Sequence, residues 1–309
     1  MASFGFNLQL EEYSIELALK TAKLVEDLGL DAVFVNDHYM KRSRNNIQDA
    51  FLMLTAMALK TKRIKIGTAV TPIPFRSAPQ TAKVVSTLDN ISKGRFIFGV
   101  GAGWNQAEFE GYGVEFLPAR ERVSKTIEGI SLMKRMWTED TVTFQGRYYH
   151  IKDAVLLPKT FQKPHPPILI GSRSPRMRRF AAREGDGWIP GHLSSKSYKD
   201  IMDEIIGEAE KRGRRRNDLT FVHFTRILTG PHMDEVLKSV SKDQISRIRE
   251  RYIVGPPENC VEKLQEYVDI GVDLILLRLH HLAQTSFAKE KKHHQQIMFI
   301  NNEIISQLR

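Results

Sequence analysis

The stretch "GRFIFGVGAGWNQAEFEGYG", residues 94–113, places an apolar strand directly before the glycines at positions 99, 101 and 103. It is similar to the G-x-G-x-x-G loop that binds dinucleotide phosphates, but that loop follows the first strand of an open sheet. Here the third glycine is replaced by Trp104 or Gln106, depending on the register, and the strand is the fourth in the chain. The function of these glycines therefore depends on the fold.

Apolar runs alternate with amphipathic segments along the 309 residues. The amphipathic segments have the 3.6-residue period of helices, and several apolar runs are hydrophobic on both faces, as in parallel sheets. Eight strands with helices between them favour a closed (β/α)8 TIM barrel, in a single domain over residues 1–309. The predicted strands are residues 4–8, 31–36, 63–70, 95–101, 166–171, 186–190, 219–230 and 272–279.

The segment "TVTFQGRYYHIKDAVLLP", residues 141–158, interrupts this alternation. Its pattern predicts a β-hairpin inserted after the fourth βα unit. Binding specificity is often carried by loops on a rigid scaffold. We therefore expect the hairpin and the loops after the seventh and eighth strands to determine the choice of substrate.

Composition narrows the classes of partner. Lys and Arg number 46 against 36 Asp and Glu, and the densest basic run is "KRGRRR", residues 211–216. Because no aromatic residues are interleaved with it, the run favours a solvated helix end over nucleic-acid binding. No apolar stretch approaches the ~20 residues of a membrane helix, and the N-terminus does not read as a signal peptide. The single cysteine, Cys260, excludes an intrachain disulfide and favours a cytoplasmic setting.

The carboxyl ends of the strands of a barrel form its active-site face. Glycines there allow a flat ligand to approach the backbone, or they form a tight turn. Asp37 and His38 end the second strand. A histidine exchanges protons near neutral pH, and an adjacent carboxylate can orient it, so we predict that His38 is catalytic and that Asp37 orients it. The alternative is a histidine that caps the loop.

The segment "IGSRSPRMRR" ends the fifth strand. The backbone N–H groups of Gly171 and Ser172 at a helix N-terminus, with Arg173 and Arg176, suit a phosphate. The alternative is an exposed basic helix start. Arg226 and Arg278 lie late in two strands, and Arg278 faces either the mouth or the outside. The pairs His280–His281 and His293–His294 lack carboxylates or cysteines at ligand spacing, so no metal site is predicted.

Several motifs in order resemble the luciferase-like monooxygenase superfamily, and within it the branch dependent on the deazaflavin coenzyme F420. They are "ALKTAKLVEDLGLDAVFVNDHY", "GVGAGWNQAEFEGYGVEF", "PHPPILIGS", "AAREGDGWIP" and "VGPPENCVEKLQEYVDIGVDLILLRL". The resemblance implies that His38 contacts the cofactor ring and that Ala69–Val70 is a non-prolyl cis peptide facing it. It also places the cofactor phosphate near Gly171. The remaining cofactor-binding residues predicted at the mouth are Gly101, Ala102, Gly103, Trp104 and Glu108.

Two of these residues keep a structural alternative. Trp104 is interpreted as packing against the cofactor or covering the pocket, and the structural alternative is a core tryptophan. Glu108 bonds polar groups of the ring or substrate, or caps the following helix.

The predicted function is hydride transfer between coenzyme F420 and a small organic substrate. One alternative is an FMN-dependent monooxygenase that uses oxygen and receives reduced flavin from a partner flavin reductase. Another is a non-catalytic protein that binds a flavin or deazaflavin. The resemblance also implies a homodimer, and neither nucleic acid nor a membrane is expected as a partner.

Overall fold

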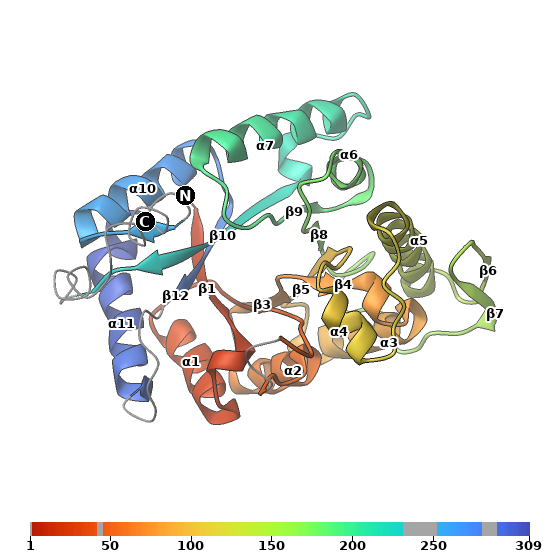
Figure 1. Cartoon of the computed structure of the whole chain (residues 1–309), viewed down its shortest axis with the longest axis horizontal. Helices are drawn as coiled ribbons and strands as arrows, with labels where there is room; N and C mark the ends of the chain where they lie inside the picture. The colour runs from red at the N-terminus through yellow and green to blue at the C-terminus, as the bar shows by residue number, and fades with distance from the viewer. Residues whose placement is uncertain (1, 42–45, 231–251, 280–288) are drawn as a thin grey trace.

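The computed structural model describes residues 2–41, 46–230, 252–279 and 289–309. Eight parallel strands close into a barrel, as the sequence predicts, with β12 paired to β1 and β9 paired to β10 (Figure 1). In order around the barrel they are β1 (Ser3–Leu8), β2 (Ala32–Val35), β3 (Lys65–Thr68), β5 (Phe96–Gly101), β8 (Ile168–Ile170), β9 (Gly187–Trp188), β10 (Thr220–Leu228) and β12 (Leu274–Leu279).

Helices surround the strands (Figure 1). Their apolar faces explain the packing: α1 buries Ala18, Ala22 and Val25, which recur at helical spacing, while its N-terminus is capped by the Ser14 hydroxyl. The larger helices are α1 (Ile15–Asp27), α2 (Ala50–Lys60), α3 (Ala78–Ser92), α5 (Ala119–Thr138), α6 (Pro175–Glu184), α7 (Ser195–Glu210), α10 (Pro257–Asp269) and α11 (Lys289–Glu303). Short 3-10 helices cover Leu10–Glu12, Ile73–Phe75, Arg216–Asp218 and Ile305–Gln307.

The barrel interior changes character along the strands. Successive side chains of a strand point to opposite faces, so every second residue points inward. The apolar interior includes Phe34, Val222, Leu274 and Leu276, all buried. The inward-facing residue that follows Leu276 is Arg278, so the carboxyl ends of the strands form a polar mouth above an apolar floor.

Short elements border this mouth. Two-residue strand β4 (Thr71–Pro72) pairs with β5, and β11 (Ile253–Val254) pairs with β10. Helix α4 (Gln106–Gly111) follows the glycines after β5. Strand β4 directly follows Ala69–Val70 and α4 contains Glu108, residues that the resemblance assigns to the cofactor.

The inserted segment forms an antiparallel hairpin of β6 (Val142–Gln145) and β7 (His150–Ala154). It lies outside α5 (Figure 1), where Glu128 of α5 accepts backbone N–H bonds from Tyr148 and Tyr149. None of its residues lines the mouth of the barrel. The hairpin therefore does not line the described cavity, and its role in substrate choice stays a prediction. The loops after the seventh and eighth strands, residues 231–251 and 280–288, lie outside the described residues.

The basic run is partly structural rather than only a solvated helix end. Arg214 donates to the carbonyl oxygens of Ala182 and Gly185, at 2.8 Å each, and Arg216 pairs with Asp273 at 3.0 Å. These contacts join the segment after α7 to the C-terminal end of α6 and to the loop before β12. Across the described part of the chain, no helix combines the length and apolar character needed to cross a membrane.

Candidate active site

A cavity of about 690 Å³ opens at the carboxyl ends of the strands. Every site residue predicted from the sequence lines it except Arg176. The sequence places Arg226 and Arg278 late in two strands without assigning them a role and leaves the direction of Arg278 open; both line the cavity. Its other lining residues are Gln9, Asn36, Lys41, Pro72, Ile189, Pro190, Gly191, His192 and Phe224.

Val70 explains two of the glycines at the mouth. The Ala69–Val70 peptide bond is cis, as the resemblance implies, and the Val70 side chain is half-buried on the cavity wall. A Cβ at Gly101 would lie 2.8 Å from Val70 Cγ2, and one at Gly171 would lie 2.5 Å from Val70 Cγ1. Both glycines therefore make room for this side chain, so ligand approach is not needed to explain them. Gly103 has a φ of +73°, as a tight turn requires.

His38 is held by Glu108, not by Asp37. His38 Nδ1 lies 3.1 Å and 3.2 Å from the two carboxylate oxygens of Glu108. Glu108 Oε1 also accepts the backbone N–H groups of Tyr39 at 2.6 Å and Met40 at 3.1 Å. A carboxylate only accepts hydrogen bonds, so Nδ1 carries a proton. In the neutral imidazole, Nε2 is then the atom that can accept a proton.

Glu108 is buried and remains a carboxylate. Burial opposes its ionisation, but the hydrogen bonds from His38, Tyr39 and Met40 outweigh this effect and hold the pKa of Glu108 below its ordinary value. Glu108 therefore does not cap helix α4. Its carboxylate oxygens already accept hydrogen bonds from His38, Tyr39 and Met40, which leaves less of the carboxylate available to a ligand. It fastens the loop after β2 and orients the histidine.

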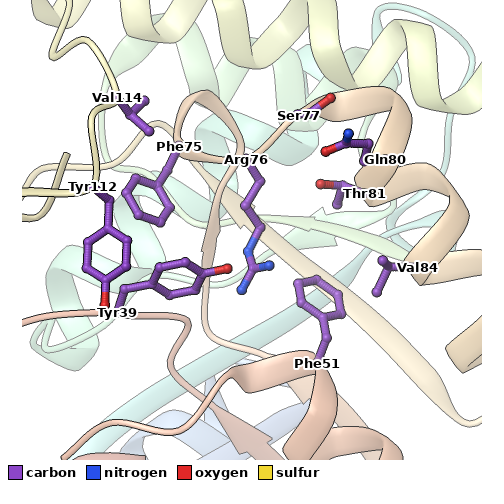
Figure 2. A pocket seen from close by; sticks show the side chains of 10 residues that line it. All are labelled: Tyr39, Phe51, Phe75, Arg76, Ser77, Gln80, Thr81, Val84, Tyr112 and Val114. Carbon is purple, nitrogen blue, oxygen red and sulfur yellow. The ribbon is translucent and has the colours of Figure 1, made fainter.

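Asp37 has a different partner, so the prediction that it orients His38 is wrong. Arg76 donates to Asp37 through Nε at 2.9 Å and Nη2 at 2.8 Å, and Nη2 also donates to Asp49 at 2.8 Å. Burial raises the pKa of Asp37, while Arg76 acts in the opposite direction. Figure 2 shows the Arg76 guanidinium between the rings of Tyr39 and Phe51, whose centroids lie 4.8 Å and 4.9 Å from its Cζ. Asp37 therefore belongs to a largely buried ion-pair cluster with Arg76 and Asp49, beside the loop that follows β2.

The segment after β8 supplies fewer anion contacts than predicted. Gly171 donates its N–H to the carbonyl oxygen of Val100 at 2.7 Å, so this group is already used within the barrel. The Arg176 guanidinium points away and donates to Ser124 of α5 at 2.8 Å. Ser172 and Arg173 remain on the cavity wall.

Trp104 lies at the rim. Its relative exposure is 71%, so the core interpretation is wrong, and its ring meets that of His38 edge-on at 5.9 Å between centroids. The histidine pair on α11 is structural: His293 Nε2 lies 2.8 Å from the Tyr13 hydroxyl and His294 Nε2 lies 3.1 Å from the Thr21 hydroxyl. His280 and His281 lie outside the described residues, and within those residues no three potential metal ligands gather.

The family model of luciferase-like monooxygenases matches residues 2–248. The chain belongs to this family. It is 33% identical to an F420-dependent glucose-6-phosphate dehydrogenase of Amycolatopsis mediterranei, over 88% of this chain and 91% of that protein. It is 28% identical to a protein of the same name from Microbacterium testaceum, over 87% and 88% of the two chains. A monooxygenase from Streptomyces bottropensis shares the fold, with a TM-score of 0.83, 21% identity and coverage of 99% and 100%.

Proposed function

We propose that the protein is an oxidoreductase that transfers a hydride between coenzyme F420 and a small organic substrate bound at the mouth of the barrel. The His38–Glu108 pair, which lines the 690 Å³ cavity together with Val70, carries this proposal. The names of the relatives from Amycolatopsis mediterranei and Microbacterium testaceum support F420 as the cofactor.

The described residues fit such a cofactor. Ala69 and Val70 form a largely apolar wall on which a flat ring can lie, and Ser172 and Arg173 provide a hydroxyl and a fixed positive charge for a phosphate. Coenzyme F420, when bound, supplies the ring carbon that donates or accepts the hydride. The protein positions the reactants and excludes water from the mouth, with Trp104 at the rim.

His38 handles the proton. Oxidation of an alcohol releases a proton from the hydroxyl oxygen, and reduction of a carbonyl requires one. Because Glu108 holds Nδ1 in the protonated state, Nε2 of His38 is the atom that takes up or returns this proton. The ionised Glu108 also stabilises the imidazolium that forms when His38 takes it up.

The first test is cofactor choice. Purified protein is titrated with F420 and with FMN, following fluorescence, and turnover is then measured with and without oxygen. We expect binding of F420 and oxygen-independent turnover. Preferential binding of reduced FMN with oxygen consumption contradicts the proposal and makes the protein an oxygenase supplied by a flavin reductase.

Arg173 and Arg176 form a matched pair for locating the cofactor phosphate. A charge-assisted hydrogen bond contributes roughly 1.5–3 kcal/mol, so Arg173→Ala is expected to weaken F420 binding about tenfold or more. Arg176→Ala removes the same charge from a side chain that points to α5, and its affinity should stay within about twofold of the wild type. Equal losses in the two variants indicate a general charge effect instead of a phosphate contact.

We also propose that the chain forms a homodimer through α2 and α3. Leu52 and Leu59 lie seven residues apart on one face of α2 and are 73% and 67% exposed. Val84 of the adjacent α3 is exposed too, and with Phe51 it lines a second cavity of about 320 Å³ (Figure 2). A second copy that covers this apolar face removes it from water.

The dimer proposal predicts a change in mass. Leu52→Lys combined with Leu59→Lys places two charges on the face and should convert the dimer to a monomer in sedimentation velocity at micromolar concentration. Ile15→Lys combined with Met298→Lys is the control, because these exposed apolar residues lie on α1 and α11, outside the proposed interface. A wild-type protein that sediments as one chain refutes the proposed dimer.

A further inference from the structure

Two arginines project side by side into the mouth of the barrel. Arg226 of β10 and Arg278 of β12 are partners in the register of adjacent parallel strands. The inward alternation of Val222 and Phe224 on β10, and of Leu274 and Leu276 on β12, continues to these arginines. Both line the 690 Å³ cavity. The barrel thus concentrates two positive charges at one side of the cavity.

Their charges are not neutralised by the described residues. Arg278 is only 5% exposed, and its guanidinium donates to three neutral amide oxygens, those of Asn7, Gln9 and Asn36, at 2.7–3.2 Å. Arg226 lies over the ring of Tyr252, with 5.2 Å between Cζ and the centroid. The Nε atoms of both arginines are buried without a hydrogen-bond acceptor. In the described ranges, no carboxylate forms an ion pair with either arginine.

The carboxylates nearby are engaged elsewhere. Glu11 pairs with Lys41, Asp37 with Arg76 and Glu108 with His38, and Glu12 accepts from the Gln9 amide at 2.9 Å. Burial, followed by repulsion from Arg226, lowers the pKa of Arg278 to about 10, which leaves it charged at neutral pH. Glu11 and Glu12 raise this pKa, but within the described residues no hydrogen bond or ion pair joins either of them to Arg278. A buried cation beside a second cation is costly unless an anion completes the site. The arrangement therefore calls for a negatively charged ligand group.

We propose that Arg226 and Arg278 form a subsite for an anionic group of the substrate, a carboxylate or a phosphate. This inference rests on the proposed function, because that function assigns the cofactor phosphate to Ser172 and Arg173, at a separate part of the mouth. β8, which precedes them, is the second strand from β10 and the third from β12 around the barrel. β2, which precedes His38, is the second strand from β12 on the other side. A substrate anchored at the arginine pair extends toward His38.

The probe is inorganic phosphate, added to the protein saturated with F420 so that the cofactor occupies its own phosphate site. Binding is followed by calorimetry at constant ionic strength, with chloride as the reference anion. We expect phosphate to bind the wild type, and Arg226→Gln to weaken that binding about tenfold or more. Arg212→Gln is the control, because it removes one charge from a half-exposed surface arginine just after the C-terminal end of α7. Its phosphate affinity should equal that of the wild type.

The remaining outcomes separate the sources of the anion. Unchanged F420 affinity in Arg226→Gln supports a substrate subsite, whereas a comparable loss of F420 affinity assigns the arginines to the cofactor and overturns the inference. Phosphate binding that is equal in Arg226→Gln and wild type also overturns it. If F420 does not bind at all but phosphate binding still depends on Arg226, the proposed function fails and the anion subsite stands. Arg226→Lys keeps the charge and should retain part of the phosphate affinity. That retained affinity would show that substitution at position 226 leaves the fold intact.

Discussion

His38→Ala is expected to lower turnover by about 10²-fold or more at saturating F420, the typical contribution of a general acid or base. F420 affinity should change little, because His38 is not part of the proposed phosphate contact. Cofactor titration by fluorescence gives the affinity, and single-turnover reduction of F420 gives the rate. A variant that loses affinity but keeps its rate once saturated makes His38 a binding residue and contradicts the proton-transfer role.

Glu108→Gln is the companion variant. An amide oxygen still accepts the backbone N–H groups of Tyr39 and Met40, so the loop should keep its conformation. The variant lacks the negative charge that stabilises the imidazolium. We expect a smaller loss of turnover than in His38→Ala, with unchanged F420 affinity. A full wild-type rate in Glu108→Gln indicates that the carboxylate only supports the loop.

Arg76→Met is expected to lower the free energy of unfolding by about 3–5 kcal/mol, the range for removal of one partner of a buried ion pair. The substitution leaves Asp37 buried without its two hydrogen bonds, and it removes the contact with Asp49 at the N-terminus of α2. Urea unfolding followed by circular dichroism measures the change.

The control for this prediction also removes the charge of Asp37. The double variant Arg76→Met, Asp37→Asn no longer buries an unpaired carboxylate, so it should recover part of the lost stability. A loss below about 1 kcal/mol in Arg76→Met, which is typical of exposed pairs, contradicts the assignment of this cluster to the buried interior.

The strand pattern was predictable because it depends on local periodicity. Apolar runs in the sequence predict all eight barrel strands. Eight strand–helix units in a chain of this length predict that the sheet closes into a barrel. The rule that active-site residues follow the strand ends then brings His38, Val70, Gly101 and Ser172 to one cavity. These inferences need no knowledge of side-chain direction.

The errors concern side chains whose partners are distant in sequence. Asp37 and Arg76 are separated by 39 positions, and His38 and Glu108 by 70, so adjacency along the chain suggested the wrong carboxylate. Arg176 was assigned by its place in a basic segment, whereas its direction depends on packing between α5 and α6. The alternation of Leu274 and Leu276 does indicate that Arg278 points inward, once those residues are placed in the barrel interior.

The packing of Val70 against two glycines has an evolutionary consequence. The width of the mouth on that side is set jointly by three positions on three neighbouring segments, because a side chain at Gly101 or Gly171 and the side chain of Val70 compete for one volume. A larger residue at either glycine is compatible with the barrel only if position 70 shrinks in return. Substitutions at positions 70, 101 and 171 are therefore coupled. Joint replacement of these residues would change the shape of the pocket without disrupting the barrel, and would allow it to accept rings of a different shape.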